Sequence, residues 1–129
     1  MKVSETAPVE PAWHAGPTMC SERLLLEHIT SRWGVLILIA LLGRPYRFGE
    51  LRRAIGRVTE KMLTQTLQTL ERDGLVRRDA KPVIPPHVDY SLTDLGREAA
   101  EQIRALARWT EERMPAVEKA RGGYDAGRA

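Results

Sequence analysis

The chain has 129 residues, enough for one domain with a hydrophobic core, and its 43% hydrophobic content is typical of a globular protein. No apolar run approaches the roughly 20 residues of a membrane-spanning helix. The N-terminus does not combine a basic start with an apolar signal core. Together these absences predict a cytoplasmic protein without membrane contact.

The positive charge of the chain is concentrated in one segment. Residues 44–81 hold ten Lys or Arg against five Asp or Glu, so this segment carries +5 and, with an overall charge of +3, the remainder carries −2. This distribution is typical of a nucleic-acid-binding surface. Aromatic residues make up only 5% of the chain, which argues against a single-strand binder built on stacking platforms.

The two ends of the chain differ from its middle. Residues 1–17 contain three prolines and little periodicity, which predicts a flexible N-terminal arm. Residues 122–129 are Gly-rich and polar, and we expect a disordered tail. The folded domain is expected over residues 18–121.

Two helices are predicted at the start of this domain. Residues 21–30 include three consecutive leucines, and residues 32–42 are apolar on nearly every side, as in a buried helix. Gly43 and Pro45 end the second helix. In a domain this small, one side of that helix is available to a second subunit.

Residues 47–76 have the layout of a helix-turn-helix. Phe48, Leu51 and Ile55 share one face of a first helix, because they recur at i, i+3 and i+7. Gly56 suits a tight turn with positive φ. Thr59 is a good N-cap for the next helix, because its hydroxyl can accept from a backbone N–H of the first turn.

The second helix of this motif is predicted to read DNA. Leu63, Leu67 and Leu70 form its apolar stripe, and Gly74 ends it in a Schellman-like stop. Gln side chains can bridge an adenine edge, and Lys can contact guanine or phosphate. The alternative is a solvated helix face. The residues expected to contact DNA are Thr59, Lys61, Thr64, Gln65, Gln68 and Arg72.

A β-wing is expected to follow. Residues 75–78 are predicted as a strand, residues 79–86 as a loop stiffened by three prolines, and residues 87–92 as a half-buried strand with alternating apolar side chains. An ordinary surface hairpin is the alternative, but its place after a helix-turn-helix favours a wing. The wing residues expected to reach phosphates or the minor groove are Arg77, Arg78 and Lys81.

A last long helix begins after Thr93, which is predicted to cap it. Its apolar stripe runs from Leu95 to Met114 with Trp109 beside it, and Pro115 is expected to break or kink the chain. The small winged body leaves little core to cover this stripe. We therefore expect dimerisation through the C-terminal helix.

These elements, in this order, resemble the HxlR (DUF24) family of MarR-like bacterial winged-helix regulators. The matching residues are Cys20, Trp33, RFGELRRAI (47–55), VTEKMLTQTLQTLERDGLV (58–76) and PPHVDYSLTDLG (85–96). The resemblance implies a mainly α protein with a small β-hairpin, binding a pseudo-palindromic operator as a homodimer. It also implies that the N- and C-terminal helices form the dimer contacts. The chain departs from the family pattern at Ser21, where Pro is usual, and at residues 30–32, where Thr-Ser-Arg replaces Gly-Gly-Lys.

Cys20 is the only cysteine, so an intramolecular disulfide is impossible. It lies at the start of the first predicted helix, where the helix dipole stabilises a thiolate. Members of the resembled family use a cysteine at this position to sense oxidants or electrophiles. The other interpretation is a small buried apolar residue, and the sequence leaves both open.

The sequence contains no constellation typical of an enzyme. Its three histidines lack metal-ligand spacing, and it has no Gly-rich phosphate loop and no nucleophile elbow. We therefore expect neither metal nor cofactor. The predicted function is sequence-specific double-stranded DNA binding. The alternative is a winged-helix protein-interaction module, which would not need a polar reader helix beside a basic wing.

Overall fold

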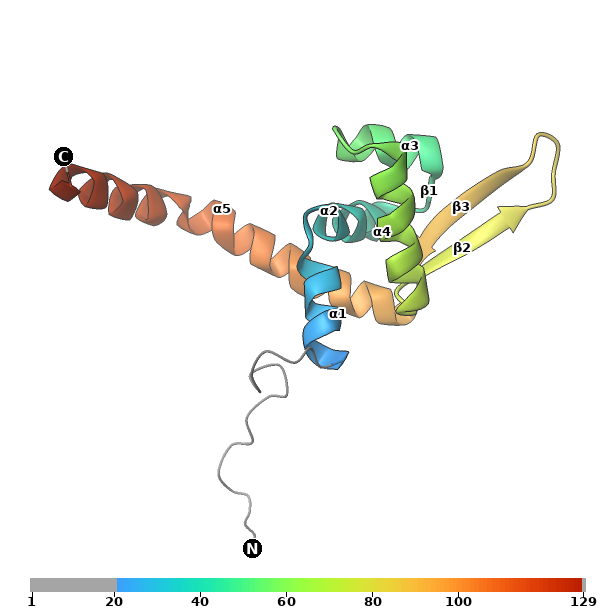
Figure 1. Ribbon diagram of the computed structural model, residues 1–129, viewed down its shortest axis with the longest axis horizontal. Helices are drawn as coiled ribbons and strands as arrows, with labels where there is room; N and C mark the ends of the chain where they lie inside the picture. The colour runs from blue at the N-terminus through green and yellow to red at the C-terminus, as the bar shows by residue number, and fades with distance from the viewer. Residues whose placement is uncertain (1–20, 129) are drawn as a thin grey trace, which may run out of the picture.

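The computed structural model describes residues 21–128, which form a mainly helical domain with a three-stranded antiparallel sheet (Figure 1). This is the winged helix-turn-helix arrangement that the sequence predicts, with one additional short strand. The elements in chain order are α1 (Ser21–Thr30), α2 (Arg32–Gly43), β1 (Tyr46–Arg47), α3 (Phe48–Ile55), α4 (Glu60–Arg72), β2 (Val76–Lys81), β3 (His87–Leu92) and α5 (Asp94–Arg128).

Helix α2 lies at the centre of the core, as its apolar sequence predicts. Its buried side chains Ile37, Leu38 and Leu41 belong to one cluster with the buried stripe of α4 and with Leu51 of α3. Each such side chain stabilises the fold by about 1.5–3 kcal/mol relative to an exposed one. Burial is not complete around the helix, because Leu36 is 38% exposed. The helix-turn-helix is therefore built directly on α2.

The sheet has the strand order β1-β3-β2. On β3, the buried Tyr90 and its half-buried neighbours Val88 and Leu92 pack against the core, as their alternation predicts. Strand β1 was not expected, because two residues are too short to show a period of two. It is defined by pairing, with Tyr46 opposite Tyr90.

The predicted boundary between strand and wing loop is wrong by three residues. The β2–β3 ladder continues through Asp79 opposite Asp89 to Lys81 opposite His87. Residues 76–81 contain no proline, so every backbone N–H there can take part in a ladder, and Pro82 is the first residue that lacks one. The wing loop is therefore confined to residues 82–86.

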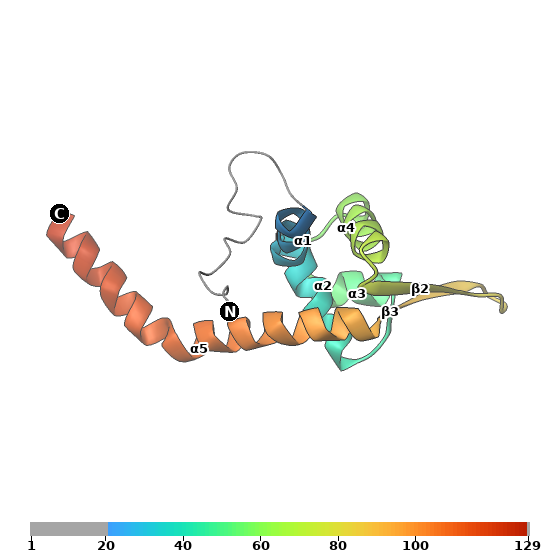
Figure 2. The same ribbon diagram turned by 90° about the horizontal axis from the view of Figure 1, so that it is seen from below.

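Helix α5 is 35 residues long, about 52 Å at 1.5 Å per residue. Its first turns pack on the body, where Gly96, Ala100 and Ile103 are buried, and the rest projects away from it (Figures 1 and 2). Figure 2 shows α5 bending in its orange-red part, and Pro115 lies inside the helix. The proline ring removes one helical hydrogen bond, so a kink rather than a break fits the sequence expectation.

The expectation of a disordered tail is wrong for residues 122–128, which continue α5 as helix. Adding a residue to an existing helix costs far less than nucleating one, so a Gly-containing segment can extend a helix that is already formed. The predicted arm at residues 1–17 and the candidate sensor Cys20 lie outside the described residues. Within residues 21–128, no single helix is long and apolar enough to cross a membrane. Helices α1 and α2, bent by 71° relative to each other, are together long and apolar enough for a span, by length and composition only.

Candidate DNA-binding surface

The turn between α3 and α4 is held by a set of short hydrogen bonds. Gly56 has φ of +106°, a conformation that other residues rarely adopt, and the N–H of Val58 donates to its carbonyl at 2.9 Å. The Thr59 hydroxyl accepts from the N–H of Met62 at 3.1 Å, as the predicted N-cap should. Arg52 spans the turn, donating from Nε to the carbonyl of Val58 at 3.0 Å.

The other end of α4 is a complete Schellman motif. The N–H of Leu75 donates to the carbonyl of Leu70 at 2.9 Å, the N–H of Gly74 donates to that of Glu71 at 3.0 Å, and Gly74 has φ of +80°. The Thr93 hydroxyl then donates to the carbonyl of Gly74 at 2.6 Å and accepts from the N–H of Gly96 at 2.9 Å. Thr93 thus caps α5 and ties it to the end of α4.

The structure exposes the residues expected to contact DNA from α4, while the leucine stripe is buried. The exposed set is Thr59, Lys61, Thr64, Gln65, Gln68 and Arg72. Thr59 differs from the others, because its hydroxyl already serves the N-cap.

A concavity of about 400 Å³ separates α4 from the wing and brings three predicted DNA-contacting residues together. Thr64 and Gln68 of α4 and Arg78 of β2 line it, with Leu67, Glu71 and Tyr90. Gln65, which is about 60° around α4 from Gln68, lines a different crevice, against α1, with Leu24 and His28. The two glutamines therefore present their side chains to different surroundings.

The three predicted wing residues are divided between the two faces of the sheet. Side chains alternate along a strand, so Arg78, paired with Tyr90, lies on the face toward α4. Arg77 and Lys81 lie on the opposite face. Of the three, only Arg78 therefore lies at the concavity beside α4, the helix predicted to read DNA and called the reader helix below.

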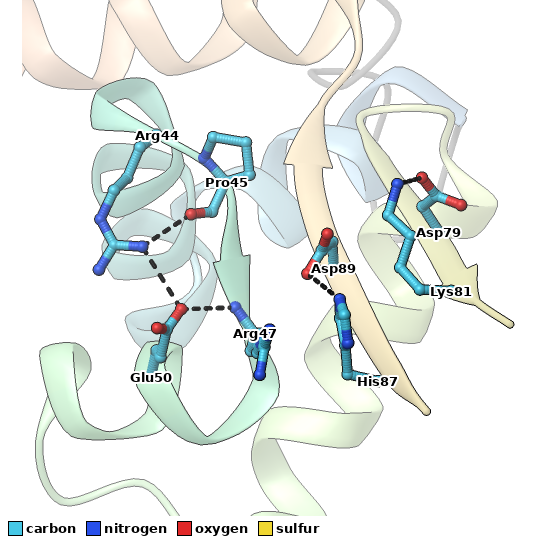
Figure 3. Close-up of polar contacts among 8 residues, drawn as sticks. All are labelled: Arg44, Pro45, Arg47, Glu50, Asp79, Lys81, His87 and Asp89. Atoms are coloured by element: carbon cyan, nitrogen blue, oxygen red, sulfur yellow. Dashed lines mark hydrogen bonds and ion pairs between the residues drawn. The ribbon is translucent and has the colours of Figure 1, made fainter. Parts of the chain in front are cut away.

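Lys81 is engaged by an acid of its own strand. Its Nζ lies 2.7 Å from Oδ2 of Asp79 (Figure 3). This hydrogen bond raises the pKa of Lys81 and lowers the pKa of Asp79. On the neighbouring strand β3, Nε2 of His87 lies 3.6 Å from Oδ1 of Asp89 of the same strand. Asp79 and Asp89 therefore partly compensate the positive charge of this face of the wing.

Sequence reasoning missed two features near the reader helix. Glu50 accepts from the backbone N–H of Arg47 at 3.0 Å and from Arg44 at 3.4 Å, which fixes the start of α3 (Figure 3). The Arg47 N–H is the main cause that lowers the pKa of Glu50. A second, basic concavity lies at the α3–α4 turn. The density of arginines at residues 52–57 is the sequence signal that could have located it.

An exposed polar helix held by a helix-turn-helix, with a β-wing beside it, defines a winged helix-turn-helix protein. Residues 28–118 match the HxlR-like helix-turn-helix family, so the chain belongs to the HxlR family. It is a helix-turn-helix transcriptional regulator and not an enzyme, as the sequence predicted.

Relatives support this assignment over most of the chain. The HTH-type transcriptional regulator YtfH of Escherichia coli is 57% identical over 98 residues, covering 76% of this chain and 78% of YtfH. The solved structure of the YtfH regulator of Salmonella typhimurium is 52% identical, with a TM-score of 0.75 over 81% of this chain and 93% of its own. The diamide-treated structure of YodB from B. subtilis is 29% identical, with a TM-score of 0.62 over 74% and 96% of the two chains.

Proposed function

We propose that this regulator is a cytoplasmic homodimer that binds double-stranded DNA sequence-specifically at a pseudo-palindromic operator. The observation that carries the proposal is the shared surface of α4 and the wing, where Thr64, Gln68 and Arg78 line one concavity. Thr and Gln side chains suit base edges in the major groove. A guanidinium beside them suits the phosphates that border the groove.

In this arrangement α4 enters the major groove and the wing lies along its border. Gln65 and Gln68 contact base edges from neighbouring positions on the helix surface, and Gln can hydrogen-bond an adenine bidentately. Lys61 and Arg72 lie exposed on the same helix, near its two ends, and reach guanine edges or phosphates. Arg77 and Lys81 contribute phosphate contacts from the outer face of the wing.

The homodimer is supported by apolar surface that the described residues leave uncovered. On α1, Leu24, Leu25 and Leu26 are 38–45% exposed, and on α5, Leu106 and Trp109 are 56% and 53% exposed. Clusters of this kind mark interfaces in proteins that are otherwise polar outside. A two-fold dimer through these helices would place the two α4 helices about 34 Å apart, one turn of B-DNA.

Selection of bound sequences from a random duplex pool tests the proposal directly. We expect an inverted repeat whose half-sites are one helical turn apart, and an affinity that falls steeply with salt. Retention of random duplex without any enriched sequence would contradict specific readout. No salt-dependent retention at all would instead favour the alternative, a winged-helix protein-interaction module.

A redox response at Cys20 is a further part of this proposal. It is supported by the helix-start position seen in the sequence and by the relative solved after diamide treatment. With one thiol per chain, oxidation gives either an intersubunit disulfide or a mixed disulfide with a small thiol. Diamide is expected to change operator affinity in the native protein and not in Cys20→Ser. An equal response in both proteins would leave Cys20 as a packing residue.

A further inference from the structure

The α3–α4 turn forms a basic concavity separate from the one between α4 and the wing. Its volume is about 370 Å³. The residues that line it are Arg52, Arg53, Gly56, Arg57, Val58 and Thr59. Three of these six carry a permanent positive charge, since an arginine side chain does not deprotonate in proteins.

The three arginines have different roles. Arg52 is engaged, because it binds the carbonyl of Val58 and its Nη1 lies 3.3 Å from Oε2 of Glu60. Arg53 and Arg57 are exposed, and they make no ion pair or side-chain hydrogen bond with any residue in the described range 21–128. Two of the arginines that line this concavity are therefore available to a ligand.

The surrounding structure fixes the backbone positions from which these two side chains extend. Val58 is 2% exposed and anchors the turn in the core, while Gly56 adopts its positive φ between Arg53 and Arg57. Glu60, the first residue of α4, would repel an anion, but Arg52 holds its carboxylate. The positive end of the α4 dipole lies at the same place and adds to the attraction for an anion.

The position of the concavity relative to the reader helix indicates which anion it meets. In Figure 1 the α3–α4 connection and the wing lie on opposite sides of α4. The exposed stretch from Lys61 to Gln68 is about 10 Å long, comparable to the roughly 12 Å width of the major groove. When α4 fills the groove, the turn meets one bordering strand while the wing faces the other.

We infer that Arg53 and Arg57 form a phosphate clamp, a site at the α3–α4 turn that holds one backbone phosphodiester of the operator. The inference rests on the proposed DNA binding and adds a contact that carries no base information. A guanidinium fork can bind two phosphate oxygens at once, which fixes the register of α4 in the groove.

The test measures Kd by fluorescence anisotropy on selected operator and random duplex across a salt series. Arg53→Ala and Arg57→Ala are each expected to weaken binding to both duplexes by up to about tenfold. The slope of log Kd against log salt should fall by about 0.9 for each phosphate that the variant no longer binds. Their ratio of operator to random affinity should stay unchanged. Arg121→Ala, an exposed arginine far along α5, is the matched control and should change neither quantity.

A second measurement identifies the phosphate itself. Replacing single phosphates of the operator by neutral methylphosphonates should reveal one position whose neutralisation weakens the native protein and leaves the Arg57→Ala variant unaffected. A steep salt slope in the native protein, unchanged in both variants, would overturn the clamp and leave the proposed function standing. A native protein without salt-dependent DNA binding would overturn both.

Discussion

His28 of α1 and Asp73 at the end of α4 are joined by a hydrogen bond of 2.6 Å from ring Nδ1 to carboxylate Oδ2. The two side chains are 22% and 14% exposed, so water screens this contact less than the ion pairs of the wing. It connects a helix that we assign to the dimer interface with the C-cap of the helix that we assign to the major groove. Movement of α1 would therefore be transmitted to α4.

A double-mutant cycle on this pair measures the connection. His28→Ala and Asp73→Ala are each expected to lower the free energy of unfolding by about 1 kcal/mol, and the double variant should lose less than their sum because the pair is shared. Urea unfolding supplies the values. His87→Ala, on the wing, is the matched control and should cost less, because its contact with Asp89 is longer, at 3.6 Å. Strict additivity at His28 and Asp73 would show that the contact is not formed in solution.

Gly96 is expected to be intolerant of any side chain. A Cβ at this position would overlap the backbone carbonyl of Leu75, which cannot move away without disturbing the end of α4. Gly96→Ala should therefore destabilise the protein by about 2–4 kcal/mol. Gly123→Ala on the same helix meets nothing within 4 Å and should stabilise by about 0.5–1 kcal/mol. Thermal unfolding of the two variants decides, and equal midpoints would contradict the close packing.

The reader helix and the wing should respond differently to substitution. Gln65→Ala and Gln68→Ala are each expected to cost about 1–3 kcal/mol on the operator and to relax base preference. Arg78→Ala should weaken all sequences alike and reduce the salt slope by about one unit. Lys81→Ala should reduce that slope less, because Asp79 already engages the ammonium group. If both glutamine variants still discriminate the operator from other sequences, the assignment of α4 to the major groove is wrong.

The dimer interface is expected to be sensitive to charge. Leu106→Glu and Trp109→Glu place carboxylates on the exposed apolar part of α5, where pairing with a second copy would bury them at high cost. Sedimentation equilibrium should show a dimer for the native protein at micromolar concentration and a monomer for these variants. Ile84→Glu, at the 99% exposed wing tip, should leave the dimer intact. A stable native monomer would contradict the proposed assembly.

Acidification should weaken the start of α3. The pKa of Glu50 is lowered in the folded state by the Arg47 N–H and Arg44, so its contribution is present at neutral pH and is lost as the pH falls below about 4.5 and through the folded value. Glu50→Gln should therefore have a lower thermal unfolding midpoint than the native protein at pH 7, and the difference between the two midpoints should shrink toward pH 3. Glu118→Gln, exposed on α5, controls for the loss of a surface charge. A midpoint difference that grows on acidification would contradict a lowered pKa of Glu50 in the folded state.

Local patterns in the sequence were sufficient to predict the helix-turn-helix, its leucine stripe, the caps at Thr59 and Thr93 and the stop at Gly74. These features depend on periodicity and on hydrogen bonds between residues close in the chain, so they are readable without a fold. The same patterns placed the polar face of α4 correctly at the surface.

Tertiary packing, in contrast, sets which polar residues share a surface. Strand pairing extends β2 as far as Lys81. Within this strand Lys81 lies on the face opposite Arg78 and beside Asp79. Packing of α1 against α4 made Gln65 line a crevice different from the one that Gln68 lines, and it brought His28 to Asp73 across 45 residues. The strand pairing, the α1–α4 packing and the His28–Asp73 contact join segments distant in the chain. Their geometry depends on the packing of the whole core around α2, which no local pattern records.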